Sequence, residues 1–133
     1  MKTFYVGIKG FIAKDGKVLL LKKVGEDLWE TPGGRIDGDE TIQEALNREL
    51  HEEVANIKNI EIKDILGAHR LQKDINGDTS LVLIYYLVRA DIDGIPELSD
   101  EHDDYMWADK DEALKAMADK RRIIEKIFEE LEA

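Results

Sequence analysis

The 133-residue sequence predicts a mixed α/β (α+β) sandwich of strands and helices. Segments rich in aromatic and β-branched residues fill much of the chain up to residue 107, and two amphipathic helical patterns close it. A third helical pattern lies between the strands. The chain holds no internal repeat or linker, and its two Pro residues, Pro32 and Pro96, fall in loop-like contexts. We therefore expect one domain over residues 1–133.

The first third of the chain predicts a β-hairpin followed by a loop. Residues 4–13 and 17–22 have the composition of strands, and Asp15-Gly16 between them is a tight-turn signal. Residues 24–38 are rich in Gly and contain Pro32, so we expect mostly loop in this segment.

Residues 40–54 predict a helix. Thr41, with Glu44 three residues later, has the form of a capping box. We expect Asn56 to end the helix in a left-handed conformation, because Asn tolerates that conformation better than most residues. Apolar residues recur at helical spacing, namely Ile42, Ala45, Leu46, Leu50 and Val54.

The remaining elements are predicted from the same kinds of signal. Residues 60–72 and 80–88 have strand composition and flank Asn76-Gly77, a strong hairpin signal. Residues 91–104 predict a polar loop, residues 105–107 a short strand, and residues 109–118 and 121–131 two helices. The last helix has an apolar stripe that we expect to be buried, formed by Ile123, Ile124, Ile127, Phe128 and Leu131.

Composition excludes several kinds of site. The chain carries 19 Lys and Arg, 30 Asp and Glu, a formal net charge of −11 and no Cys, so disulfides, thiolate nucleophiles and Cys-ligated metals are excluded. The sequence shows no signal peptide and no stretch near the roughly 18 apolar residues of a membrane span, so we expect a cytoplasmic protein. The negative charge disfavours a nucleic-acid polymer as partner. A small anionic substrate would need a positive receptor such as a bound metal ion.

The helix predicted over residues 40–54 carries acidic residues on its apolar side. On a helical wheel, Glu49 and Glu53 fall inside the apolar arc and Glu52 falls at its edge. Buried carboxylates are unfavourable unless they are paired or metal-bound, and the single Arg48 cannot neutralise all three. Two interpretations stay open here: a site for Mg²⁺, which prefers oxygen ligands, and a charged network at the helix edge. The opposite side of the wheel carries Glu44, Asn47 and His51.

The polar residues around this helix also have a fixed spacing. Gly34 is followed after five residues by Glu40, and after seven more by Arg48-Glu49-Leu50-His51-Glu52-Glu53. With the preceding Trp29-Glu30-Thr31-Pro32-Gly33-Gly34, this segment resembles the Nudix box, which would span residues 34–56. Two positions depart from the box, because Ala55 stands in place of its Gly and Asn56 in place of its last apolar residue. These departures bear on the loop geometry after the helix and remove no expected metal ligand.

The resemblance implies a Nudix-type α/β/α sandwich, with a mixed β-sheet between helices. It implies a hydrolase of nucleoside diphosphate derivatives that depends on Mg²⁺, with Mn²⁺ as a substitute. If the matching positions of the family's motif have the same roles here, the metal ligands would be Glu49, Glu52 and Glu53, together with the Gly33 carbonyl.

The resemblance also assigns roles around that centre. Arg48 would orient the glutamates, Glu40 would hold the junction before the helix by an ion pair to Arg48, and Gly34 would be structural. Family members often add an acidic residue from a later loop, and Glu101 in the acidic segment 99–104 is the candidate, with a solvated acidic loop as the alternative. The general base stays open among Glu52, Glu53 and Glu101.

Cations and histidines elsewhere carry weaker signals. Lys23, Arg35 and Arg70 are candidate contacts to substrate phosphate or base, although an ordinary surface cation is the better interpretation for each. His69 and His102 are isolated in the sequence, so a structural role is favoured for both.

Four functions are weighed. The first is hydrolysis of a nucleoside triphosphate, including an oxidised one, to the monophosphate and pyrophosphate. The second is the same chemistry on a nucleotide-sugar, a dinucleoside polyphosphate or a coenzyme. The third is a catalytically silent nucleotide sensor, disfavoured by the intact glutamates. The fourth is an RNA-end hydrolase, disfavoured by the negative charge. Because Nudix proteins often form dimers, a homodimer is one expected assembly.

Overall fold

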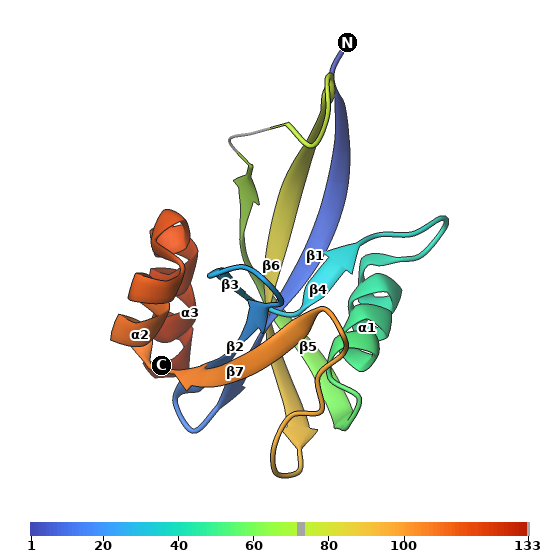
Figure 1. The fold of residues 1–133 in the computed structure, drawn as a ribbon. Helices are drawn as coiled ribbons and strands as arrows, with labels where there is room; N and C mark the ends of the chain where they lie inside the picture. The colour runs from blue at the N-terminus through green and yellow to red at the C-terminus, as the bar shows by residue number, and fades with distance from the viewer. Residues whose placement is uncertain (72–73, 133) are drawn as a thin grey trace.

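Within residues 1–71 and 74–132, which the computed structural model describes, seven strands form one mixed sheet with helices on both sides (Figure 1). The sheet order is β3-β2-β1-β6-β5, with β4 also paired to β1 and β7 to β2. Helix α1 lies on one side of this sheet, and α2 and α3 lie on the other (Figure 1). The predicted α/β/α sandwich is confirmed.

Strand β1 (Thr3–Lys14) organises the sheet because it has three partners. It forms the predicted hairpin with β2 (Lys17–Lys23), through a turn in which Asp15 and Gly16 have φ values of 52° and 76°. Two positive φ values match the hairpin turn that Asp-Gly favours. β1 also runs parallel to β6 (Thr79–Ile92), in register from Thr3 to Ile12.

The prediction of mostly loop over residues 24–38 is wrong at two places. β3 (Trp29–Glu30) pairs with β2, and β4 (Gly33–Arg35) pairs antiparallel with β1. Such short strands are held by pairing with distant residues, which local composition cannot reveal. At Gly33 the backbone has φ of 143°, and a Cβ would collide with the Ile8 carbonyl oxygen, so only Gly fits this close approach.

Helix α1 (Ile42–Glu53) begins with the predicted capping box between Thr41 and Glu44. The prediction that Asn56 caps its C-terminus is wrong, since the cap residue is Val54 in an extended conformation. The Asn56 side chain instead bonds the backbone of residues 93–97, with Nδ2 donating to two carbonyls and Oδ1 accepting from Glu97 N–H. This contact joins segments about 40 residues apart, so no local sequence pattern predicts it.

Strand β5 (Ile57–Arg70) pairs antiparallel with β6, as predicted, but both strands are longer than expected. Gln72, the last residue of the predicted strand 60–72, lies outside the described residues. The predicted loop 91–104 is shorter, spanning residues 93–101, because β6 reaches Ile92 and β7 (His102–Ala108) begins early. Acidic residues suggested loop at 102–104, but pairing with β2 makes them strand.

The chain closes with α2 (Lys110–Ala116), a 3₁₀ turn (Ala118–Lys120) and α3 (Arg121–Glu132). Four residues of the predicted stripe on α3 are buried, and Leu131 packs partly buried against them. One apolar core lies under α2 and α3, and a second lies under α1, around Leu46 and Leu50. No helix in the described part of the chain is long and apolar enough to cross a membrane.

Candidate active site

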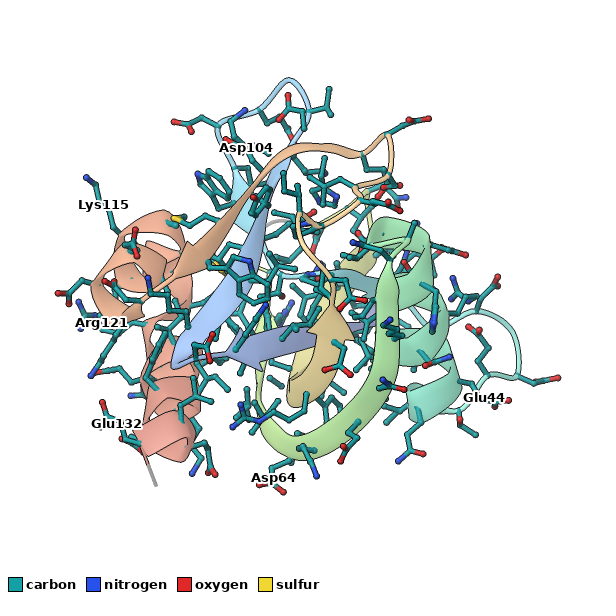
Figure 2. The ribbon with its side chains drawn as sticks, turned by 90° about the horizontal axis from the view of Figure 1, so that it is seen from below. Glu44, Asp64, Asp104, Lys115, Arg121 and Glu132 are labelled. Carbon is teal, nitrogen blue, oxygen red and sulfur yellow. The ribbon has the colours of Figure 1, made fainter. Side chains whose placement is uncertain are left out.

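The C-terminal half of α1 brings its acidic residues against β4. Glu53 is 4% exposed, and the side chain of Glu49 is 17% exposed, so both face inward as the helical wheel predicts. Glu52, predicted at the edge of the apolar arc, is the exposed member of the three, at 58% of its side chain. Figure 2 shows Glu44 on the side of α1 that faces away from the sheet, also as predicted.

The two glycines of β4 let its backbone touch these carboxylates. The Gly33 N–H donates a hydrogen bond of 2.5 Å to Glu53 Oε2. A Cβ on Gly34 would come within 2.5 Å of the Glu49 carboxyl group, so a larger residue would displace that side chain. Gly34 is therefore required by close packing against an acidic side chain, and Gly33 by its close approach to the Ile8 backbone.

Arg48 links the glutamates to the start of the helix. Its Nε and Nη2 bind Glu40 at 2.6 and 2.8 Å, and its Nη1 binds Glu49 at 2.9 Å and approaches Glu52 at 3.4 Å. The ion pair expected between Glu40 and Arg48 is thus present. The hydrogen bond from Arg48 lowers the pKa of Glu40 to about 2, with help from the Asp37 backbone.

Glu53 lies in a different electrostatic environment. Burial raises its pKa to about 7, although Lys9, the Gly33 hydrogen bond and His102 act in the opposite direction. Positive charge nearby is thus too weak to offset the desolvation of this carboxylate. A hard divalent cation would supply the missing charge, and oxygen atoms are the ligands that it prefers. The residues present therefore fit a magnesium-type ion.

The loop 93–101 brings Glu101 to these glutamates, as the sequence predicts. Glu101 shares a cleft of about 260 Å³ with Glu49, Glu52 and Glu53. Glu49 and Glu101 also line an adjoining cleft of about 540 Å³, together with Gly33, Gly34, Arg35 and Arg48.

A third, more apolar cavity of about 390 Å³ adjoins the cleft of about 540 Å³, with which it shares Gly34 and Arg35. Lys23 and Arg35, both candidate substrate contacts in the sequence, line it. Arg70 lies elsewhere, with its guanidinium 4.9 Å from the centre of the Phe4 ring. Its lining also includes Trp29, Glu30, Leu83, Tyr85, Met117 and Asp119.

The family model of the NUDIX domain matches residues 1–127 of this chain. The chain belongs to the Nudix family. It is therefore a Nudix hydrolase, and its relatives include a pyrophosphohydrolase and a pyrophosphatase with different substrates.

Curated Nudix relatives carry different substrate names. A CTP pyrophosphohydrolase of Escherichia coli (strain K12) is 29% identical over 114 residues, covering 81% of this chain and 78% of that protein. An ADP-ribose pyrophosphatase of Methanocaldococcus jannaschii is 29% identical over 124 residues, covering 76% and 72%. An RNA pyrophosphohydrolase of Halorhodospira halophila is 52% identical, but over only 40 residues, which make up 22% of that protein.

Solved structures agree on the Nudix fold. The solution structure of the E. coli ORF135 protein has a TM-score of 0.76 and 29% identity, covering 99% of this chain and 93% of that one. An Ap4A hydrolase from C. elegans has a TM-score of 0.78 and 23% identity, covering 98% of both chains. The second likeness is evidence for the fold alone.

Three residues near the site are absent from the predicted site residues, namely Lys9, Glu30 and His102, the last of which was expected to be structural. His102 is buried, and its Nε2 lies 2.8 Å from Glu30 Oε2. Glu30, Glu53 and His102 offer atoms within 4.8 Å of one another and could together hold a metal ion. In the sequence, only the neighbours of two of these residues point to the site. Glu30 lies in the segment before Gly33, and His102 directly follows Glu101. Nothing in the sequence marks Lys9.

Proposed function

We propose that this Nudix hydrolase converts a nucleoside triphosphate into the monophosphate and pyrophosphate, using Mg²⁺ held by the glutamates of α1. The observation that carries this proposal is that the acidic cleft of about 540 Å³, lined by Glu49 and Glu101, shares Gly34 and Arg35 with an apolar cavity of about 390 Å³. That volume falls within the range of about 300–1,000 Å³ typical of small-molecule sites. The cavity takes the nucleoside, and the acidic cleft takes the metal-bound phosphates.

The metal would be held by Glu49, Glu52 and Glu53, with the Gly33 carbonyl and Glu101 as further ligands. When bound, it neutralises the diphosphate and lowers the pKa of a coordinated water. Arg48 keeps Glu49 in place, and a carboxylate of the cluster accepts the proton of the attacking water. The new bond joins the water oxygen to phosphorus, and the P–O bond that breaks belongs to the anhydride between the α- and β-phosphorus atoms, so the nucleoside monophosphate separates from pyrophosphate.

Asp119 is a candidate for recognising the nucleobase of the substrate. It lines the apolar cavity, where burial raises its pKa, but the hydrogen bond and charge of Lys120 at 2.9 Å, its own backbone N–H and His69 together lower it further, so the pKa is below its usual value. An ionised carboxylate only accepts hydrogen bonds, so it favours a base with an exocyclic amino group. The CTP pyrophosphohydrolase among the relatives supports this choice.

A second candidate is the same cleavage in a nucleoside diphosphate linked to another group, such as a sugar, a nucleoside or a coenzyme. The adjoining cleft of about 540 Å³ favours it, because the Arg35 guanidinium lies over the Tyr5 ring at 4.7 Å there and forms a surface for a second group. The ADP-ribose pyrophosphatase among the relatives also supports this candidate.

Product analysis on a nucleotide panel tests the proposal. The panel holds triphosphates, oxidised triphosphates, nucleotide-sugars and dinucleoside polyphosphates, each with Mg²⁺ or with EDTA. Metal-dependent release of monophosphate and pyrophosphate from a triphosphate is expected, with Glu52→Gln and Glu53→Gln reducing turnover by orders of magnitude. Glu44→Gln is the matched control, since Gln preserves the capping box on the outer side of the same helix.

Turnover that survives EDTA, or survives both Glu52→Gln and Glu53→Gln, would refute the metal assignment. A preference for a nucleotide-sugar would select the second candidate. Nucleotide binding without turnover of any substrate would indicate a sensor.

A further inference from the structure

A largely buried polar cluster lies next to Glu53 and takes no part in the proposed metal binding and hydrolysis. It consists of Lys9 from β1, Glu30 from β3 and His102 from β7. Lys9 is 6% exposed, and the His102 side chain is fully buried. His102 Nε2 donates to Glu30 Oε2 at 2.8 Å, and Lys9 Nζ lies 3.8 Å from Glu30 Oε1. Because Glu30 accepts from Nε2, the orientation of the imidazole ring is fixed.

The inward position of His102 depends on an irregularity in β7. The pairing of β7 with β2 shifts between Lys22 and Lys23, so that Lys22 lies opposite Asp104 and Lys23 opposite His102. Such a bulge re-aims the side chains next to it, and here Asp103 and Asp104 are both exposed while His102 is buried. The local fold therefore directs one imidazole into the interior, where Glu30 meets it.

The other ring nitrogen of His102 faces the proposed metal ligand Glu53. Nδ1 lies 3.9 Å from Glu53 Oε1, and it has no hydrogen-bond partner among residues 1–71 and 74–132. Glu53 Oε2 already accepts from the Gly33 N–H. The carboxylate is thus held on one side by the β4 backbone and confined on the other by the imidazole.

His102 also fixes the end of the loop that carries Glu101. The backbone carbonyl of Glu101 accepts from Val24 N–H at 3.0 Å, and Ser99 N–H donates to the Glu53 carbonyl at 3.2 Å. With the His102–Glu30 bond, this loop is attached within four residues to Val24, directly after β2, to the end of α1 and to β3. These bonds consequently hold the backbone of Glu101 near α1.

We propose that His102, anchored by Glu30, is a positioning residue that presents Glu53 and Glu101 to the metal ion. This inference rests on the metal site of the proposed function. The competing possibility is that Glu30, Glu53 and His102 bind an ion of their own. Lys9 argues against it, because its ammonium group already supplies a positive charge beside Glu30.

Mn²⁺ binding, followed by electron paramagnetic resonance, tests the proposal without requiring turnover. His102→Gln and Glu30→Gln are compared with His51→Gln, a matched control whose histidine is exposed on α1 and bonds Asn47. Residues that orient metal ligands typically contribute about 10–100-fold to metal affinity. We expect both cluster variants to weaken Mn²⁺ binding by at least about tenfold, and the control to match the wild type.

Kinetics supply a second readout. The Mg²⁺ concentration for half-maximal rate should rise in both cluster variants more than kcat falls at saturating Mg²⁺. Thermal unfolding establishes that the variants are folded. Should His102→Gln fail to fold, Glu30→Gln carries the test, because Gln keeps the shape and the acceptor of a side chain that is only partly buried.

Three results would overturn or redirect the inference. Unchanged Mn²⁺ affinity in the folded variants would overturn it while leaving the proposed function intact. Loss of one of two Mn²⁺ sites, with the other unaffected, would show a separate metal site instead. Undiminished Mn²⁺ binding in Glu49→Gln would contradict the proposed function itself.

Discussion

Replacing Gly34 by Ala tests whether β4 must pack directly against the metal-binding glutamates. The added Cβ would lie 2.5 Å from the Glu49 carboxyl group, whereas ordinary contact begins at 3.4 Å. The Glu49 carboxyl group must therefore move by about 0.9 Å, and this movement distorts its 2.9 Å hydrogen bond with Arg48. A misplacement near 1 Å can cost about a hundredfold in rate.

We therefore expect Gly34→Ala to lower kcat by about a hundredfold at saturating Mg²⁺. Because the backbone at Gly34 is outside the left-handed region, the free energy of unfolding should change by no more than about 1 kcal/mol. The measurements are steady-state kinetics and thermal unfolding. Gly10→Ala is the matched control, because its Cβ crowds Val88 in the core at 2.9 Å and should affect stability without this loss of kcat.

A double variant isolates the mechanism. In a Glu49→Ala background there is no carboxyl group to displace, so adding Gly34→Ala should change neither Mn²⁺ affinity nor residual activity further. Wild-type kcat in Gly34→Ala, or an equal loss with and without the Glu49 carboxylate, would refute the reasoning.

Three other predictions concern stability. The depressed pKa of Glu40, about 2 against the usual 4.5, means that the ion pair with Arg48 stabilises the fold above pH 4.5 and is lost as the pH falls through 2. The stability difference between wild type and Glu40→Gln should therefore shrink over that range, and a constant difference would contradict the pairing. Asn56→Ala removes three hydrogen bonds to residues 93–97 and should cost about 1–3 kcal/mol in chemical denaturation; no loss would show that the contact is dispensable. Leu46→Ala should cost about 2–5 kcal/mol in the same assay because Leu46 is fully buried, and a loss under 1 kcal/mol would mean that the core under α1 is loosely packed.

The sequence predicted those features that depend on local periodicity. The inward positions of Glu49 and Glu53 follow from helical spacing, and the capping box at Thr41 follows from residues three apart. The hairpin at Asp15-Gly16 likewise needs only its own turn chemistry. Each of these is set by residues within a few positions of one another.

The features that the sequence missed are set by contacts between distant segments. The inward turn of His102 requires the irregular pairing of β7 with β2, and its anchor Glu30 lies 72 residues away. Asn56 was expected to cap a helix, but the backbone of residues 93–97 offers its side chain three hydrogen bonds. The strands β3 and β4 exist because β1 and β2 supply partners. Local propensity carries no information about such partners.

The most direct test of the account is to locate Mn²⁺ in crystals of the protein by anomalous diffraction. The account predicts an ion bound by carboxylate oxygens of Glu49, Glu52 and Glu53, at the side of the cleft that faces Glu101. An ion bound only by Glu30 and His102, or no ordered ion at saturating Mn²⁺, would contradict the claim that the glutamates of α1 form the catalytic metal centre.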